Sequence, residues 1–194
     1  MSCRLLYFDG SPFARFVRIL AMEWGVEMSC EEIKVFPFED ALFDETPFGQ
    51  VPVLYDGDDV LFPTQIIVER LAERAGIGLE RQKLAVALQM GDALVAAKYQ
   101  EWAGLGPVAE NFLGFDPAAR HMERVFRTLD WFADCDAPEG VSAHIVAVAV
   151  FLLWAESRGP IPWRGDAWRE ALVDFCAKRA SFRATEPTAW EPER

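Results

Sequence analysis

The run at residues 145–155 (IVAVAVFLLWA) is apolar at every position, and it constrains the fold more than any other segment of the chain. It is well short of the roughly 20 residues that a transmembrane helix needs, so it predicts a buried helix and no membrane span. A helix that is apolar on every face must be covered by other helices. The sequence therefore predicts a helical domain of some size around this run.

The rest of the second half of the chain also has helical patterns, separated by segments rich in glycine and proline. The predicted helices are residues 84–102, 118–133, 142–158 and 166–178. No convincing strand follows Gly76 and Gly78. We expect an all-helical domain, built as a helical bundle, over residues 80–194.

The first part of the chain alternates between strand and helix patterns and predicts an α/β domain over residues 1–76. We expect a strand at 4–9, a helix at 13–24 and a second strand at 28–35 that is parallel to the first. Short strands at 51–55 and 60–62 flank a hairpin turn, and a helix follows at 66–75. Residues 36–48 have no clear period and predict a loop with at most a short helix.

Charge and cysteine usage exclude several classes of function. The net charge is −12, with 31 acidic against 19 basic residues, which argues against nucleic acid and anionic membranes as partners. The four cysteines are scattered and only two histidines are present, so we expect neither a metal site nor a disulfide. The N-terminus has no pattern typical of a secretory signal, which predicts a cytoplasmic protein.

Ser11 stands where the first predicted helix begins. Serine is a favoured N-cap, Pro12 suits the first helical position, and Gly25 suits the end of the helix. The free N–H groups and the dipole at such a helix terminus favour an anion. From this segment alone, two interpretations stay open: Ser11 only caps the helix, or its hydroxyl also contacts a bound anion.

Three separated segments together resemble the glutathione transferase superfamily, in particular bacterial members with a serine-type active site. They are SPFARFVRI at residues 11–19, TPFGQVPVL at 46–54 and KRASFRATEP at 178–187. The resemblance implies a thioredoxin-like N-terminal domain that binds glutathione and a helical C-terminal domain that adds most of the second-substrate pocket. It also implies a homodimer and a role in detoxification.

The resemblance also implies roles for individual residues. Ser11 would stabilise the glutathione thiolate for attack on a small apolar electrophile, with no metal involved. Pro52 would be cis, and Val51 before it would bind the cysteinyl part of glutathione through its main chain. Gln50 would contact the glycyl carboxylate, and Phe13 would contact both substrates. Aromatic residues would complete the second-substrate pocket: Tyr99, Trp102, Phe112 and Phe115.

Two positions depart from the family pattern. Thr64 keeps a hydroxyl that could cap the helix after it and contact the γ-glutamyl carboxylate, but Pro63 replaces the acid that would hold the γ-glutamyl amine. The loss of one charge-assisted hydrogen bond weakens the binding free energy by about 1.5–3 kcal/mol. At the start of the apolar helix, His144 stands in place of a capping-box aspartate, and Ser142 is expected to cap instead.

Pro63 keeps a second class of function open. A non-catalytic binding or regulatory protein on the same scaffold, with weak or no affinity for glutathione, is the alternative to a transferase. Within the enzyme class, a glutathione-dependent isomerase or dehalogenase also fits the sequence.

Overall fold

The computed structural model describes residues 3–33, 41–103, 117–138, 140–158 and 163–188. The chain divides into two compact units. The first consists of Met1–Leu79 together with Lys178–Arg194, and the second is Glu80–Ala177.

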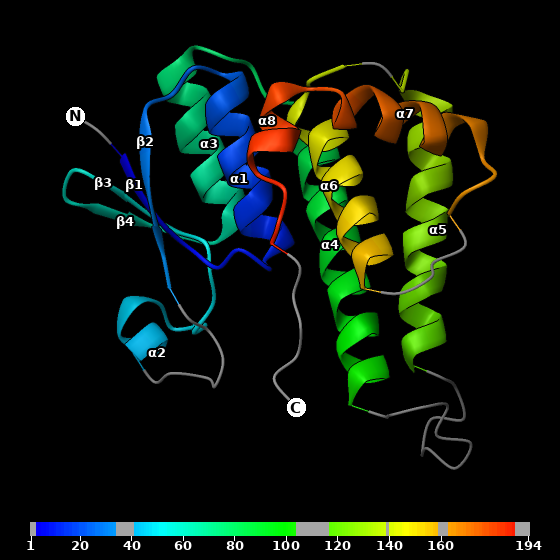
Figure 1. Cartoon of the computed structure of the whole chain (residues 1–194), viewed down its shortest axis with the longest axis horizontal. Coiled ribbons are helices and arrows are strands. Elements are labelled where there is room, and N and C mark those ends of the chain that lie inside the picture. Colours follow the sequence, from blue (N-terminus) through cyan, green and yellow to red (C-terminus); the bar gives the residue numbers. More distant parts are fainter. Residues whose placement is uncertain (1–2, 34–40, 104–116, 139, 159–162, 189–194) are drawn as a thin grey trace. The chain divides into compact units, whose positions relative to one another are not determined.

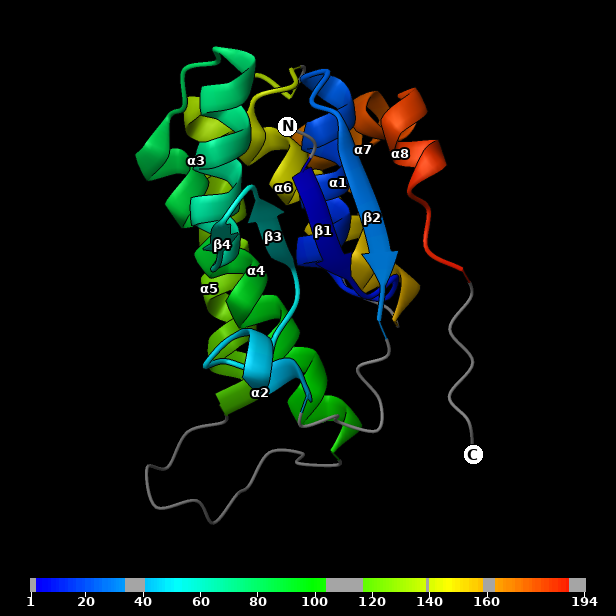
Figure 2. The ribbon, with the colours of Figure 1, turned by 90° about the vertical axis from the view of Figure 1, so that its left-hand side faces the viewer.

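A four-stranded sheet forms the centre of the first unit. Its strands are β1 (Cys3–Tyr7), β2 (Met28–Glu32), β3 (Val53–Asp56) and β4 (Asp59–Leu61), in the order β2-β1-β3-β4 (Figure 2). The pairing of β1 with β2 is parallel, which confirms the sequence prediction, whereas β3 runs antiparallel to both of its neighbours.

Two helices of 12 residues, α1 (Pro12–Glu23) and α3 (Thr64–Ala75), pack together on one face of this sheet (Figure 1). The apolar face of α1 contributes the fully buried Phe16, Val17 and Leu20 to the core. A third helix, α2 (Ala41–Glu45), is short and lies in the segment for which the sequence predicts at most a short helix.

A buried carboxylate fastens the β3–β4 hairpin to α3. Asp56 accepts hydrogen bonds from Arg70 Nη1 at 2.7 Å and from Arg74 Nε at 3.0 Å. The hydrogen bond from Arg74 contributes most to lowering the pKa of Asp56 to about 2. The carboxylate therefore stays ionised at physiological pH, and its ion pairs with Arg70 and Arg74 hold α3 against the hairpin.

The second unit is helical. Its helices are α4 (Arg81–Trp102), α5 (Pro117–Cys135), α6 (Ala143–Ser157) and α7 (Ala167–Ala177). The apolar α6 is buried along nearly its whole length and packs against α4 and α7, as the composition of residues 145–155 requires. Among the described residues, no helix has both the length and the apolarity needed to cross a membrane.

The last described helix, α8 (Ala180–Ala184), belongs to the first unit, although the sequence places residues 178–194 in the helical domain. One of the contacts that hold it there joins two charged side chains far apart in the sequence. Arg179 donates from Nε and Nη2 to the two carboxylate oxygens of Glu23 on α1, at 2.8 and 2.5 Å. This two-point ion pair fixes the start of α8 to the end of α1.

Candidate functional site

Ser11 caps α1, as the sequence predicts. Its backbone is extended, with φ −81° and ψ 120°, and its Oγ accepts a hydrogen bond from the backbone N–H of Ala14 at 3.3 Å. Its own N–H donates to the carbonyl of Phe8 at 2.9 Å, which closes the turn between β1 and α1. Because Oγ acts only as an acceptor in the capping bond, its O–H can still donate to a ligand.

The turn before β3 has the predicted geometry. The Val51–Pro52 peptide bond is cis, Pro52 is buried and Val51 is half-buried. Gln50 is exposed at the start of this turn, so its amide can reach a ligand in solvent.

At the start of α3, the prediction that Thr64 caps the helix is wrong. Pro63 occupies the N-cap position and makes no side-chain capping bond, and Thr64 is the first helical residue. The Pro63 carbonyl accepts the first helical bond, from Ile66 N–H at 2.9 Å. The backbone N–H groups of Thr64 and Gln65 precede that bond, so they point out of the helix end as donors for an anion.

The sheet register brings these three turns to the same end of the first unit. Leu6 near the end of β1 pairs with Val53 at the start of β3, and Leu61 at the end of β4 pairs with Leu54. The segments that follow β1, precede β3 and follow β4 therefore emerge at one end of the sheet. They carry the predicted glutathione-site residues Ser11, Phe13, Gln50, Val51, Pro52, Pro63 and Thr64.

The predicted second-substrate residues are divided between the units. Phe13 lies half-buried on α1 in the first unit. Tyr99 and Trp102 lie near the end of α4 in the second unit, with exposed fractions of 50% and 44%. Their ring centroids are 5.5 Å apart, and Trp102 also stacks edge-on against Trp154 at 6.2 Å. Phe112 and Phe115 lie outside the described residues.

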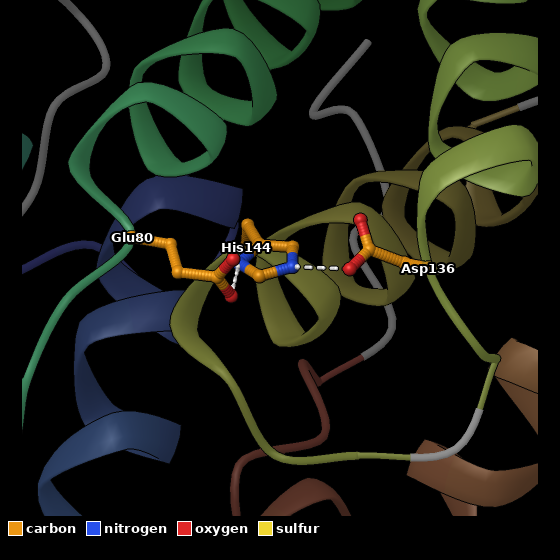
Figure 3. A group of neighbouring side chains, drawn as sticks. All are labelled: Glu80, Asp136 and His144. Carbon is orange, nitrogen blue, oxygen red and sulfur yellow. Dashed lines mark ion pairs between the residues drawn. The ribbon is translucent and has the colours of Figure 1, made fainter.

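Sequence reasoning missed a cluster in the second unit that joins the ends of three helices (Figure 3). The imidazole of His144, at the start of α6, lies between the carboxylates of Glu80 and Asp136. Its Nδ1 is 3.7 Å from Glu80 Oε2, and its Nε2 is 3.5 Å from Asp136 Oδ1. The available signal was His144 itself, a titratable side chain directly before the apolar run at residues 145–155.

The same three residues could in principle hold a metal ion, because their ligand atoms lie within 4.8 Å of one another. The two carboxylates already bind a cation, however. Lys83 Nζ lies 2.9 Å from Glu80 Oε1 and 2.6 Å from Asp136 Oδ1. A metal ion would have to compete with this ammonium group, so the arrangement favours a structural ion-pair network.

The hydroxyl of Ser142 also contacts the cluster. Ser142 is the N-cap residue of α6 by position, but its side chain makes no capping bond to a backbone N–H of the helix. Its Oγ instead lies 3.3 Å from His144 Nε2. The predicted capping role of this hydroxyl is therefore wrong, because the imidazole holds it instead.

The buried histidine predicts a pH dependence of stability. Burial is the largest effect on the imidazole and lowers the pKa of His144 below its ordinary value, although Asp136 and Glu80 oppose this shift. The unfolded chain then binds more protons than the folded chain below about pH 6.5, so stability falls as the pH decreases through that value. We expect the melting temperature to fall between about pH 7.5 and about pH 5.5, and to fall less in His144→Gln.

His121→Gln is the matched control, because it removes the other histidine of the chain. Thermal unfolding followed by circular dichroism at both pH values is the measurement. An equal decrease in the wild type and in His144→Gln would contradict the assignment.

Comparison with known proteins agrees with this fold. Residues 5–81 match the family model described as glutathione S-transferase, N-terminal domain. A solved glutathione S-transferase from Methylobacillus flagellatus KT, with glutathione bound, is 25% identical to this chain. It aligns over 96% of this chain and 100% of its own, with a TM-score of 0.72. The predicted fold class, a thioredoxin-like domain followed by a helical one, is confirmed.

Curated relatives align only with part of the chain. The glutathione S-transferase of Dirofilaria immitis is 30% identical over 80 residues, which are 41% of this chain and 38% of the relative. The stringent starvation protein A homolog of Histophilus somni is 40% identical over 58 residues, which are 30% of this chain and 27% of the relative. The chain thus spans less than two fifths of these relatives' lengths. The family model and the structural neighbour together support a relationship of this chain to the glutathione transferase superfamily.

Proposed function

We propose that this protein is a glutathione transferase-like enzyme in which Ser11 stabilises the glutathione thiolate for attack on a small apolar electrophile. One observation carries the proposal: the register of the sheet gathers the capped start of α1, the cis Val51–Pro52 turn and the uncapped start of α3 at one end. Two helix N-termini at one end of a sheet suit a ligand with more than one negative group.

The hydroxyl and the helix together can supply the free energy that the chemistry needs. A thiol has a reference pKa of about 8.5, and lowering it by about two units takes roughly 2.7 kcal/mol. A hydrogen bond to a charged sulfur contributes about 1.5–3 kcal/mol and a helix N-terminus about 0.3–1 kcal/mol. Ser11 at the start of α1 is therefore sufficient without a histidine base.

Backbone groups and two polar side chains would bind the rest of glutathione. The N–H groups at the start of α3, with the Thr64 hydroxyl, would bind the γ-glutamyl carboxylate. The main chain of Val51 would bind the cysteinyl part, and Gln50 would bind the glycyl carboxylate. Pro63 offers no charge to the γ-glutamyl amine, so we expect weaker binding than an acidic residue at that position would give.

The exposed Tyr99 and Trp102 suit an aromatic or otherwise apolar second substrate. We further propose a homodimer in the cytoplasm, with neither nucleic acid nor a membrane as partner and no metal cofactor. Light scattering coupled to size-exclusion chromatography measures the assembly, and a monomer at micromolar concentration would overturn that part of the proposal.

Glutathione titration tests the binding step directly. Tryptophan fluorescence should change with millimolar glutathione, and the ultraviolet thiolate band of the bound ligand should be present at neutral pH. S-methylglutathione is the matched control, because it should bind without producing the band. No fluorescence response to either ligand would overturn the proposal.

A non-catalytic binding protein on the same scaffold is the second candidate. Pro63 favours it, and so does the similarity of part of the chain to a stringent starvation protein A homolog. Glutathione binding without a thiolate band, and without turnover on a panel of electrophiles, would support this candidate. The same panel, extended to isomerase and haloalkane substrates, separates conjugation from isomerisation and dehalogenation.

A further inference from the structure

The segment at residues 179–188, called the C-terminal segment here, lies along α1 within the first unit (Figure 1). It is fastened first at the end of α1, where the Glu23 carboxylate binds Arg179 and also accepts a hydrogen bond from the Ser181 hydroxyl. The segment then continues towards the start of α1, so it runs antiparallel to the helix.

A buried arginine makes the second attachment. Arg15, on the second turn of α1, has an exposed fraction of only 7% and donates from Nη2 to the carbonyl of Phe182 at 3.2 Å. Its guanidinium also lies over the Phe182 ring, 5.7 Å from the centroid. This contact fixes the middle of the C-terminal segment beside the first half of α1.

The third attachment reaches the turn that carries Ser11. Asp9, two residues before Ser11, accepts two hydrogen bonds from Thr188 at Oδ2, from the backbone N–H at 2.7 Å and from Oγ1 at 2.9 Å. Its other oxygen, Oδ1, lies 3.3 Å from Arg18 Nη1. Both oxygens of the Asp9 carboxylate are thus engaged by groups outside the turn.

This engagement matters because a free carboxylate would compete for the anion site. Negatively charged side chains are stabilised at helix N-termini by the same N–H groups and dipole that would stabilise a thiolate. Asp9 stands two residues before the N-cap of α1, where an unattached carboxylate could turn towards those groups. It would then oppose a second anion beside Ser11.

We propose that Thr188 is a positioning residue, which holds the Asp9 carboxylate away from the start of α1 and so reserves that helix end for the glutathione thiolate. The inference rests on the proposed function, and it assigns the C-terminal segment a part in the chemistry at Ser11. Arg18 acts with Thr188 by binding the other oxygen of the carboxylate.

Thr188→Pro tests the inference, because proline lacks both the N–H and the hydroxyl that bind Asp9. The measurement is a pH titration of the thiolate band of bound glutathione. We expect the thiolate fraction at a fixed pH below the midpoint to fall about tenfold in Thr188→Pro and less in Thr188→Val, which keeps the N–H.

Asp9→Asn in the Thr188→Pro background provides the decisive comparison. The neutral amide cannot compete as an anion, so we expect the double variant to recover most of the thiolate fraction. A loss caused only by misplacement of the turn would not be recovered in this way. Thr185→Val is the matched control, because it removes a hydroxyl of the same segment that binds the carbonyl of Ser181 at 2.8 Å and does not bind Asp9.

The outcomes separate the two proposals. A wild-type thiolate band that Thr188→Pro leaves unchanged overturns the inference alone, and so does a loss that Asp9→Asn does not restore. Absence of the band from the wild type overturns the proposed function and the inference with it.

Discussion

Replacing Ser11 with alanine is expected to lower the glutathione-dependent rate by about ten- to a hundredfold, because the thiolate loses a hydrogen bond to a charged atom. The thiolate band of bound glutathione should shift to higher pH in parallel. The variant should also lose about 1 kcal/mol of stability, because the capping bond to Ala14 is removed. Steady-state kinetics, the thiolate titration and thermal unfolding measure the three effects.

Two further variants separate the hydroxyl from the cap. Ser11→Gly should lose as much activity as Ser11→Ala but only a few tenths of a kcal/mol of stability, since glycine is tolerated at the N-cap. Ser11→Thr keeps both the hydroxyl and the cap, so it should retain most of the activity. A thiolate band at its wild-type position in Ser11→Ala would remove Ser11 from the mechanism.

Gly91→Ala is expected to destabilise the protein by about 1–2 kcal/mol, although alanine is normally the better helix former by about 0.5–1 kcal/mol. A methyl group at Gly91, in the middle of α4, would lie 2.3–2.6 Å from ring carbons of Phe151. Phe151 is fully buried on α6, so its ring cannot turn into solvent. The overlap should therefore outweigh the gain in helix propensity.

The overlap also predicts a rescue. Phe151→Leu alone should destabilise the protein. In the Phe151→Leu background, however, Gly91→Ala should lower the free energy of unfolding much less, because the smaller side chain leaves room for the methyl group. Denaturant unfolding of the four proteins in a double-mutant cycle measures the coupling. A Gly91→Ala protein as stable as the wild type would contradict this packing of α4 on α6.

Local signals made the start of α1 predictable from the sequence. Ser11, Pro12 and Gly25 act through neighbouring backbone groups, and the structure confirms the cap. Thr64 was misassigned because Pro63, the residue before it, takes the N-cap position although it has no capping side chain. A preference for hydroxyl residues at helix starts could not reveal that shift of one residue.

Contacts between distant residues were not predictable in the same way. The ion pair of Arg179 with Glu23 joins positions 156 residues apart and is one of the contacts that hold the C-terminal segment in the first unit. The cluster around His144 likewise gathers residues from three helix ends. Neither leaves a periodic pattern in the sequence, because each depends on how complete elements pack.

The two outer strands of the sheet bear on how copies of this chain can associate. On β2, Glu31 and Glu32 are exposed, and β4 begins at the exposed Asp59 after Asp58 in the hairpin turn. Charged side chains along the outer strand of a sheet oppose the addition of a strand from another molecule. Any homodimer of this protein should therefore form through helices or loops. The outer strands should also resist the edge-to-edge pairing between molecules that leads to aggregation.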